Sequence, residues 1–233
     1  IGHVGIDETN RRFFVSDHGK LKIFAYDLDS VLTTPEYQPS VKIDMKKKLF
    51  PDDYLYLNDT LCIAKIIEPI GNNDYKPSVA RWNMATGEIN PMPYEYPDLK
   101  KVRFIYAASA EHQLYVQCYT QYDLMTICDF NGNLKCNIYG PKWVNEKTQT
   151  QHYSLGVEFC GDKILALYSG GDHRTDAYYP TKFLVFDLNG NYLKTLETGY
   201  MITDFCYDKE NNRLIINLND EIQFAYLDLE GII

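Results

Sequence analysis

Short runs of apolar residues, separated by polar turn residues, recur along the whole chain. The run FLVFDLNG at 183–190 continues as NYLKTLETG, and LMTICDFNGNLKCNIYG at 124–140 repeats the same phrase. Looser copies occur as LKIFAYDLDS at 21–30 and IQFAYLDLEG at 222–231. Apolar residues at helical spacing are nowhere sustained. The pattern therefore predicts an all-β chain of short strands.

A polar marker residue follows the third strand of each repeat. The markers lie roughly 40 to 60 residues apart, close to the length of a propeller blade, and are Asp27, Asn83, Asp129, Asp187 and Asp228. Each repeat divides into short strands separated by turns. We therefore predict one β-propeller domain over residues 1–233 with four-stranded blades. Its visible units are approximately 1–45, 46–97, 98–140, 141–199 and 200–233.

The third strands read IFAY, FLVF and FAYL, which are continuous apolar runs and not alternating ones. Such runs are typical of sheets that are covered on both faces, as blades between two neighbours are. The marker that follows each run is interpreted as a turn-capping residue and not as a metal ligand. Asn-Gly pairs at 131–132 and 189–190 predict hairpins with type I′ turns.

The last repeat is short, because only EGII follows IQFAYLDL and a fourth strand is missing. A propeller can complete its final blade with a strand from near the N-terminus, which removes an exposed sheet edge. We expect residues upstream of Ile1 to supply that strand, a further blade and a targeting segment. Five units are visible and six are expected.

The composition of the chain excludes several classes of binding partner. The formal net charge of -9 argues against nucleic acid, whose binders present basic surfaces. No apolar stretch is long enough to cross a bilayer. The six cysteines form no CxxC pair and mostly lie in strand-like runs, so we interpret them as small buried hydrophobic residues.

The segment from ILALYSG through FLVFDLNGNYLKTLETG to ITDFCYDKENNRLIINL resembles the C-terminal blades of TolB-like six-bladed β-propeller proteins. The resemblance covers most of the chain and is clearest after Leu155. It implies an exported protein of the bacterial cell envelope, either periplasmic or outer-membrane-anchored, with a lipid anchor upstream. The family is largely uncharacterised and supplies no catalytic residues.

Nearly all long insertions are expected on one face of the propeller, and such a face is usually the binding face. They include residues 68–77, 140–154 and 169–180. Aromatic side chains beside Lys, Arg and His suit a glycan, a peptide or a protein. The predicted ligand-binding residues are Tyr75, Lys76, Trp143, His152, Tyr153, His173, Arg174, Tyr178 and Tyr179.

The favoured function is a non-catalytic binding or scaffold propeller with no cofactor. The motifs GxSxG, HExxH, the P-loop and EF-hand spacing are absent from the sequence. Asp172-His173 resembles part of an acid–base pair, but no nucleophile can be assigned to it. The alternative is a hydrolase or lyase at the mouth of the central channel that depends on a divalent cation such as calcium, with Glu158 and Asp204 as ligands. That alternative rests on analogy between folds. A structural subunit that docks other proteins is a third hypothesis.

Overall fold

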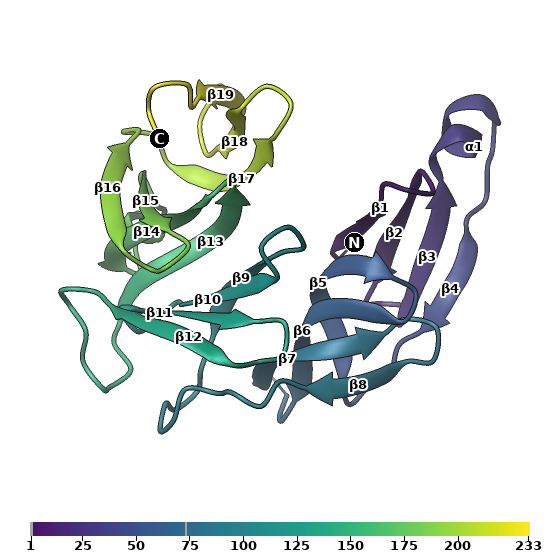
Figure 1. Ribbon diagram of the computed structural model, residues 1–233, viewed down its shortest axis with the longest axis horizontal. Helices are drawn as coiled ribbons and strands as arrows, with labels where there is room; N and C mark the ends of the chain where they lie inside the picture. Colours follow the sequence, from purple (N-terminus) through teal and green to yellow (C-terminus); the bar gives the residue numbers. More distant parts are fainter. Residues whose placement is uncertain (1, 73) are drawn as a thin grey trace. The chain divides into compact units, whose positions relative to one another are not determined.

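Nineteen strands form five antiparallel sheets in the part of the chain that the computed structural model describes, residues 2–72 and 74–233 (Figure 1). Contacts along the chain divide it into two units, Ile1–Glu95 and Tyr96–Ile233. Each unit is described by itself. In every sheet the strands lie side by side in chain order, so each sheet is a simple meander.

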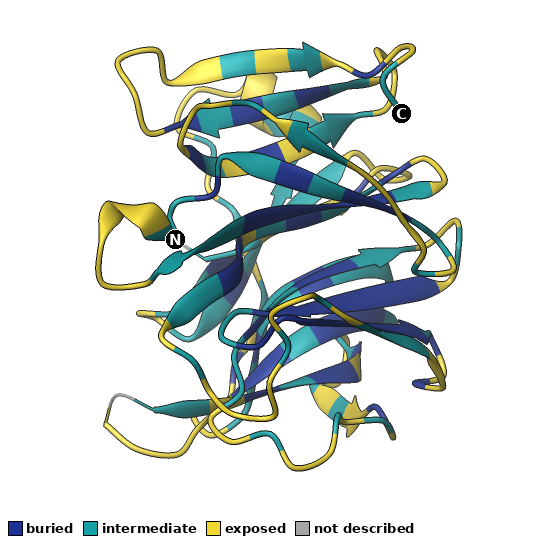
Figure 2. Ribbon diagram, turned by 90° about the vertical axis from the view of Figure 1, so that its left-hand side faces the viewer, coloured by how far each residue is buried: buried dark blue, intermediate teal, exposed yellow. Residues whose placement is uncertain are grey.

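The first unit contains two four-stranded sheets. The first sheet consists of β1 (Val4–Asp7), β2 (Arg12–Asp17), β3 (Lys22–Asp27) and β4 (Ser40–Asp44). The second consists of β5 (Phe50–Asn58), β6 (Leu61–Pro69), β7 (Tyr75–Asn83) and β8 (Glu88–Pro91). A short helix, α1 (Leu28–Thr33), follows β3, and its residues are largely exposed (Figure 2).

The second unit contains two four-stranded sheets and one three-stranded sheet. The first is built from β9 (Phe104–Ser109), β10 (Leu114–Tyr119), β11 (Leu124–Asp129) and β12 (Leu134–Tyr139). The next is built from β13 (Thr150–Cys160), β14 (Lys163–Asp172), β15 (Lys182–Asp187) and β16 (Tyr192–Glu197), with the 3-10 turn η1 (Asp176–Tyr178) before β15. The last is built from β17 (Ile202–Asp208), β18 (Arg213–Leu218) and β19 (Phe224–Asp228).

The prediction of two covered faces is confirmed for FLVF in β15, where Phe183 and Val185 pack on one side and Leu184 packs on the other. It is wrong for FAYL in β19, where Phe224 and Tyr226 are exposed.

The middle strands β10, β11 and β14 are also covered on both faces. All six residues of β10 are buried, and so are the first five of β11. In β14, Ile164 and Ala166 pack with the sheet β9–β12. The alternate residues Leu165 and Leu167 pack with the sheet β17–β19. A strand with two dry faces needs apolar residues at every position, which explains the run KILALY.

The first unit has its own core between its two sheets. Phe14 and Ile23 from the first sheet pack with Tyr54, Ala64 and Trp82 from the second. Tyr54 and Trp82 meet edge to face, with ring centroids 5.2 Å apart. Burial of a large apolar side chain contributes about 1.5–3 kcal/mol to folding, so this contact is a principal source of stability in the unit.

The marker residues cap turns, as predicted. Asp129 accepts hydrogen bonds from the amide of Asn131 at 2.8 Å, the amide of Asn133 at 2.9 Å and the side chain of Asn133 at 2.8 Å. Asp187 makes the same three bonds with Asn189 and Asn191. The remaining markers accept from turn amides as well: Asp27 from Ser30, Asn83 from Ala85 and Thr86, and Asp228 from Glu230.

The predicted type I′ turns are wrong. That turn needs a positive φ at two adjacent residues, whereas here Gly132 has a φ of 79° and Asn131 is not among the described residues with positive φ. The Gly132 amide instead donates to the carbonyl of Asp129, and the strand register shifts between Ile127 and Cys128. This is the longer hairpin in which a left-handed glycine forms a bulge. The hydrogen bonds to the Asp129 carboxylate stabilise this hairpin loop.

The expectation of a sixth blade is also wrong, because the described residues form five sheets. The missing outer strand of the last repeat was the ground for expecting another blade. The structure shows that β17–β19 form a sheet without it. The prediction that the last repeat has no fourth strand is confirmed for the described chain. Whether residues 1–233 fold as one domain stays a prediction.

The structure confirms the interpretation of most cysteines. Cys62, Cys118, Cys128 and Cys160 are buried as free thiols, whereas Cys206 is exposed. Burial raises the pKa of the Cys128 thiol to about 11 and that of Cys62 to about 12, which leaves both neutral and unreactive at pH 7. These thiols therefore pack as small apolar side chains.

We predict that Asp129→Ala lowers the free energy of unfolding by about 1–2 kcal/mol at pH 7, because three donors lose a partly exposed carboxylate acceptor. Burial raises the pKa of Asp129, but the bonds from Asn133 and the turn amides outweigh burial and lower it. The stabilisation is therefore present above the ordinary aspartate pKa of about 4 and is lost as the pH falls below it.

Urea unfolding at pH 7 and at pH 3 measures both parts of this prediction. The matched control is Asp162→Ala, since Asp162 is 76% exposed and pairs with Lys163 at the surface. A loss from Asp129→Ala no larger than that of the control, or one that stays constant down to pH 3, would show that the turn does not depend on the carboxylate.

Candidate functional site

Two long loops of the second unit meet and form one surface. They are residues 140–149, between β12 and β13, and residues 173–181, between β14 and β15. The amide of His173 donates to the carbonyl of Gln149 at 3.1 Å, and the His173 Nδ1 lies 2.9 Å from the same oxygen. We call the solvent-accessible residues of 139–149 and 172–179, which include the half-buried Trp143, the loop surface.

Trp143 is the centre of an aromatic cluster on the loop surface. Its ring lies edge to face with Tyr139 at 5.1 Å and with Tyr96 at 5.8 Å, and 6.3 Å from Tyr122. The hydroxyls of Tyr96 and Tyr139 are 3.3 Å apart. Tyr139 is 50% exposed and Val144 is 48% exposed. The cluster therefore fixes the half-buried indole and leaves apolar surface open to solvent.

A buried carboxylate supports this cluster. Asp123 is 1% exposed, accepts a hydrogen bond from the Lys142 amide at 2.9 Å, and receives the Gly140 amide on its own carbonyl at 2.8 Å. A Cβ at Gly140 would collide with the carboxyl group of Asp123. The turn at 140–142, which carries Trp143, is thus attached to a fixed point in the core.

His152 and Tyr153 were predicted to bind ligand, but each is only 1% exposed. Both lie on β13, because the predicted loop 140–154 becomes strand at Thr150. The segment TQTQHYS is polar, and its pattern therefore predicted a loop where this strand begins. Burial lowers the pKa of His152 despite the Asp123 carboxylate 3.7 Å away, so its imidazole is neutral at pH 7. The two residues support the loop surface from below.

The second loop supplies the other predicted residues. Asp172 accepts from the Arg174 amide at 2.9 Å and from its guanidinium at 3.2 Å, and the Arg174 side chain is 67% exposed. The rings of Tyr178 and Tyr179 lie 4.2 Å apart. The His173 Nδ1 faces a backbone carbonyl, and Asp172 pairs with Arg174. The His173 Nδ1 lies 3.7 Å from an Asp172 carboxylate oxygen, which is farther than the Gln149 carbonyl at 2.9 Å, so the two side chains are near each other without a hydrogen bond between them.

Tyr75 and Lys76 belong to the first unit, so they are not placed relative to the residues above. Both lie on β7, within the stretch predicted as a loop over 68–77. The Lys76 Nζ lies 3.2 Å from a carboxylate oxygen of Glu95, and both side chains are more than half exposed. The pair is a surface ion pair, a contact that contributes little to stability.

The carboxylates of the alternative hypothesis lie on neighbouring strands of the second unit. Glu158 is half-buried on β13, and Asp204 is exposed on β17 and accepts a bond from the Phe205 amide at 2.8 Å. After burial, the negative charges of these two residues raise the pKa of Cys206, so both lie near that thiol. Among the described residues, no group of three or more His, Cys, Asp or Glu is arranged to hold a metal ion.

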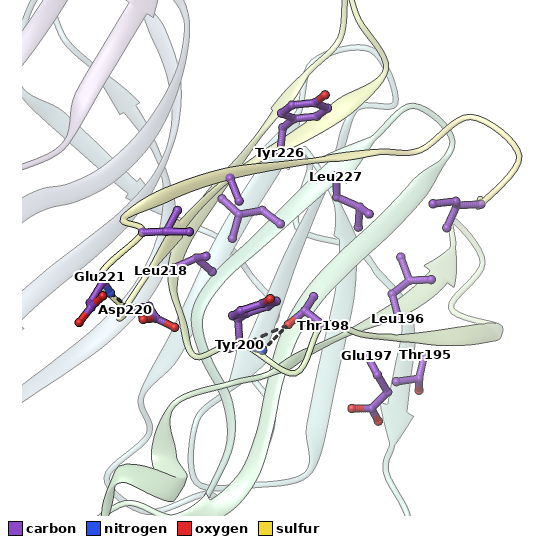
Figure 3. Close-up of a pocket in the computed structure, with 14 residues that line it drawn as sticks. Thr195, Leu196, Glu197, Thr198, Tyr200, Leu218, Asp220, Glu221, Tyr226 and Leu227 are labelled. Atoms are coloured by element: carbon purple, nitrogen blue, oxygen red, sulfur yellow. Dashed lines mark hydrogen bonds between the residues drawn. The ribbon is translucent and has the colours of Figure 1, made fainter.

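A second surface feature of this unit was not predicted as a site. An open groove of about 710 Å³ lies beside β16, β18 and β19 (Figure 3). Leu218 and Leu227 line it, and Asp220 and Glu221 lie together at one end (Figure 3). The signal that could have found the groove is the fourth strand missing after IQFAYLDL.

Solved structures with a similar fold share little sequence with this chain. The extracellular domain of the putative one component system BT4673 from B. thetaiotaomicron is 10% identical, with a TM-score of 0.62 over 98% of this chain. The match spans only 27% of that longer chain. The Nidogen/Laminin Complex matches at 12% identity and a TM-score of 0.60, covering 93% of this chain and 73% of that one.

The gluconolactonase XC5397 from Xanthomonas campestris is 17% identical, with a TM-score of 0.54, and the match covers 89% of this chain and 65% of that one. At these identities the likeness shows the fold alone, and that fold is an all-β propeller with four-stranded blades. No protein-family model matches the sequence, and no curated protein matches it either. Neither short helix of the described chain could span a bilayer.

We predict that Gly140→Ala lowers the free energy of unfolding by about 1–3 kcal/mol, because its Cβ would overlap the buried Asp123 carboxylate. In an Asp123→Ala background the same substitution should cost clearly less, since the colliding group is gone. Thermal or urea unfolding of the four proteins in this double-mutant cycle measures the difference.

Gly19→Ala is the control, because its added Cβ would come no closer than 3.4 Å to Asp17. This substitution should leave the free energy of unfolding nearly unchanged. Equal costs for Gly140→Ala in the two backgrounds would refute the role of Asp123 as the fixed point of the turn.

Proposed function

We propose that this chain is a non-catalytic binding propeller that engages a protein partner through the loop surface of its second unit. The observation that carries the proposal is the aromatic cluster around the half-buried Trp143, which is held by ring contacts on several sides and leaves Tyr139 exposed. Trp, Tyr and Arg are the residues most enriched at the energetic centres of protein interfaces. The loop surface combines Trp143, Tyr139 and Arg174.

The support beneath the cluster favours binding over a merely exposed loop. The Asp123 carboxylate fixes the turn that carries Trp143, and the bonds from His173 to Gln149 join the second loop to the first. A side chain that is already ordered loses less entropy when a partner docks on it. Trp143 and Tyr139 therefore present a largely pre-organised apolar surface.

The charged residues beside the aromatic cluster suit contact with the surface of another protein. Lys142 is exposed next to Trp143, and the exposed Arg174 guanidinium lies on the adjoining loop, with Asp172 as its local partner. An apolar centre with a charged rim is the usual anatomy of a protein interface. We infer that the partner offers an apolar side chain to the cluster and a carboxylate to the rim.

We further propose that the protein is exported and acts in the bacterial cell envelope, as a relative of the TolB-like proteins. The resemblance of residues 164–218 to that family supports this location. The likeness to the extracellular domain of BT4673 is consistent with it, although it concerns the fold. A periplasmic and an outer-membrane-anchored protein would both suit the proposal.

We predict that Trp143→Ala weakens partner binding at least tenfold while the melting temperature stays within a few degrees. The test selects peptides against the immobilised full chain from a random peptide display library and measures their affinity for each variant. Tyr192→Ala is the matched control, because Tyr192 is an aromatic residue of β16 that is 57% exposed and lies outside the loop surface.

Trp82→Ala serves as the opposite control, since Trp82 is 2% exposed and its loss should destabilise the first unit by about 3–5 kcal/mol. Selected peptides that bind Trp143→Ala and the parent chain equally would contradict the proposal. Failure to select any peptide, together with Trp143-dependent binding on a glycan array, would replace the protein partner with a glycan.

A further inference from the structure

β19 is a sheet edge without a partner. It pairs with β18 on one side, and no described strand pairs with its other side. In each of the other four sheets this place is filled by an antiparallel fourth strand, namely β4, β8, β12 or β16. Among residues 2–72 and 74–233, the last sheet therefore has no counterpart of the outer strand that the other four sheets have.

The backbone of β19 offers hydrogen-bonding groups along this edge. The Leu218 amide donates to the carbonyl of Gln223, and the Leu229 amide donates to the carbonyl of Asn212. Antiparallel pairing alternates between residues that bond to the neighbouring strand and residues that point away from it. Ala225 therefore bonds toward β18, and the amide and carbonyl groups of Phe224 and Tyr226 point outward.

Nothing in β19 protects this edge against pairing. Natural edge strands are usually blunted by Lys, Pro or a bulge. β19 reads FAYLD, and its register with β18 shows no shift. Phe224 is 68% exposed and Tyr226 is 67% exposed, and Ile222 just before the strand is 71% exposed. The side chains of Phe224 and Tyr226 are therefore open to solvent, whereas Ala225 and Leu227 on the other face pack against the core.

The groove of about 710 Å³ lies beside this edge and can receive the side chains of an added strand (Figure 3). Leu196 of β16 lines it on one side, and Leu218 and Leu227 of the last sheet line it on the other. A strand hydrogen-bonded to β19 would point every second side chain toward the groove. Those side chains should be apolar.

The acidic residues at both ends of β19 indicate which polar residues an added strand should carry. Asp220 and Glu221 precede β19, Asp228 and Glu230 lie at its end, and all four are exposed. Three of the four outer strands in the described chain carry a lysine, since β4, β12 and β16 read SVKID, LKCNIY and YLKTLE, whereas β8 reads EINP. An added strand with the same alternation and a lysine would match both the groove and the acidic ends.

We propose that the β19 edge binds an extended segment of another polypeptide, which adds to the last sheet as its fourth, antiparallel strand. The segment alternates apolar and polar residues and carries lysine. Main-chain bonds to Phe224 and Tyr226 provide its affinity, and its apolar side chains fill the groove. This site is distinct from the loop surface and does not depend on it.

The probe is a labelled peptide with the sequence of residues 191–198, NYLKTLET, which is the outer strand of the preceding sheet. Fluorescence anisotropy with the full chain should show saturable binding. Two further peptides carry N-methyl groups on alternate backbone amides, one at odd positions and one at even positions. A strand bonded to β19 uses one parity, so one peptide should lose at least tenfold in affinity and the other should bind nearly as the parent does.

Matched protein variants test the edge itself. Tyr226→Pro removes an outward amide and leaves the bonds to β18 intact, whereas Tyr226→Val keeps the amide and also removes the aromatic ring. We expect Tyr226→Pro to lose binding at least tenfold beyond Tyr226→Val, with both proteins folded by circular dichroism. Asp220→Lys combined with Glu221→Lys should also weaken binding of the lysine-bearing peptide.

Equal binding of the two N-methylated peptides would overturn the proposal, because it would indicate hydrophobic adhesion without strand pairing. So would equal binding by Tyr226→Pro and Tyr226→Val, or no binding up to about 1 mM peptide. Concentration-dependent dimers that Tyr226→Pro abolishes would assign the edge to a second copy of this chain and would overturn it as well. Trp143→Ala should leave peptide binding unchanged, which separates this test from that of the loop surface.

Discussion

The second unit depends on the burial of both faces of the middle strands β10, β11 and β14 between neighbouring sheets. β14 shows this most clearly, because Ile164 and Ala166 join one core and Leu165 and Leu167 join the next. Such a strand carries mostly apolar residues. A polar residue within it needs a partner, as Thr126 shows by donating to the side chain of Asn137. The capping residues Asp129 and Asp187 lie where the chain leaves this dry region.

The same constraint locates the surfaces available for binding. An aromatic residue on a loop is pre-organised for binding when the loop is fixed, and Asp123 fixes the turn that carries Trp143. At the last sheet the constraint is not met, because β19 has no outer neighbour in the described chain and Phe224 and Tyr226 are exposed. The loop surface therefore depends on the contacts of Asp123 with the turn that carries Trp143. The β19 edge is open because no described strand pairs with it on its outer side.

The repeat, the turn-capping role of the marker residues and the three-stranded last sheet could all be predicted, because each follows from local periodicity. The turn type could not, since the carboxylate of Asp129 selects a longer hairpin than Asn131-Gly132 alone would favour. The sequence predicts a later start for β13 than the structure shows, because the first residues of this strand are polar. His152 and Tyr153 therefore lie in the strand and are buried. The cluster around Trp143 joins Tyr96 and Tyr139, which are far apart in sequence, and only the fold brings them together.

Native-state hydrogen exchange, resolved along the chain by mass spectrometry, tests the central claim most directly. If burial on both faces holds the sheets together, amides of β10 and β14 should exchange only through global unfolding, and the outward amides of β19 should exchange fastest among the strands of the second unit. Protection of β19 equal to that of β10 would contradict this account, because it would show that the last sheet is closed.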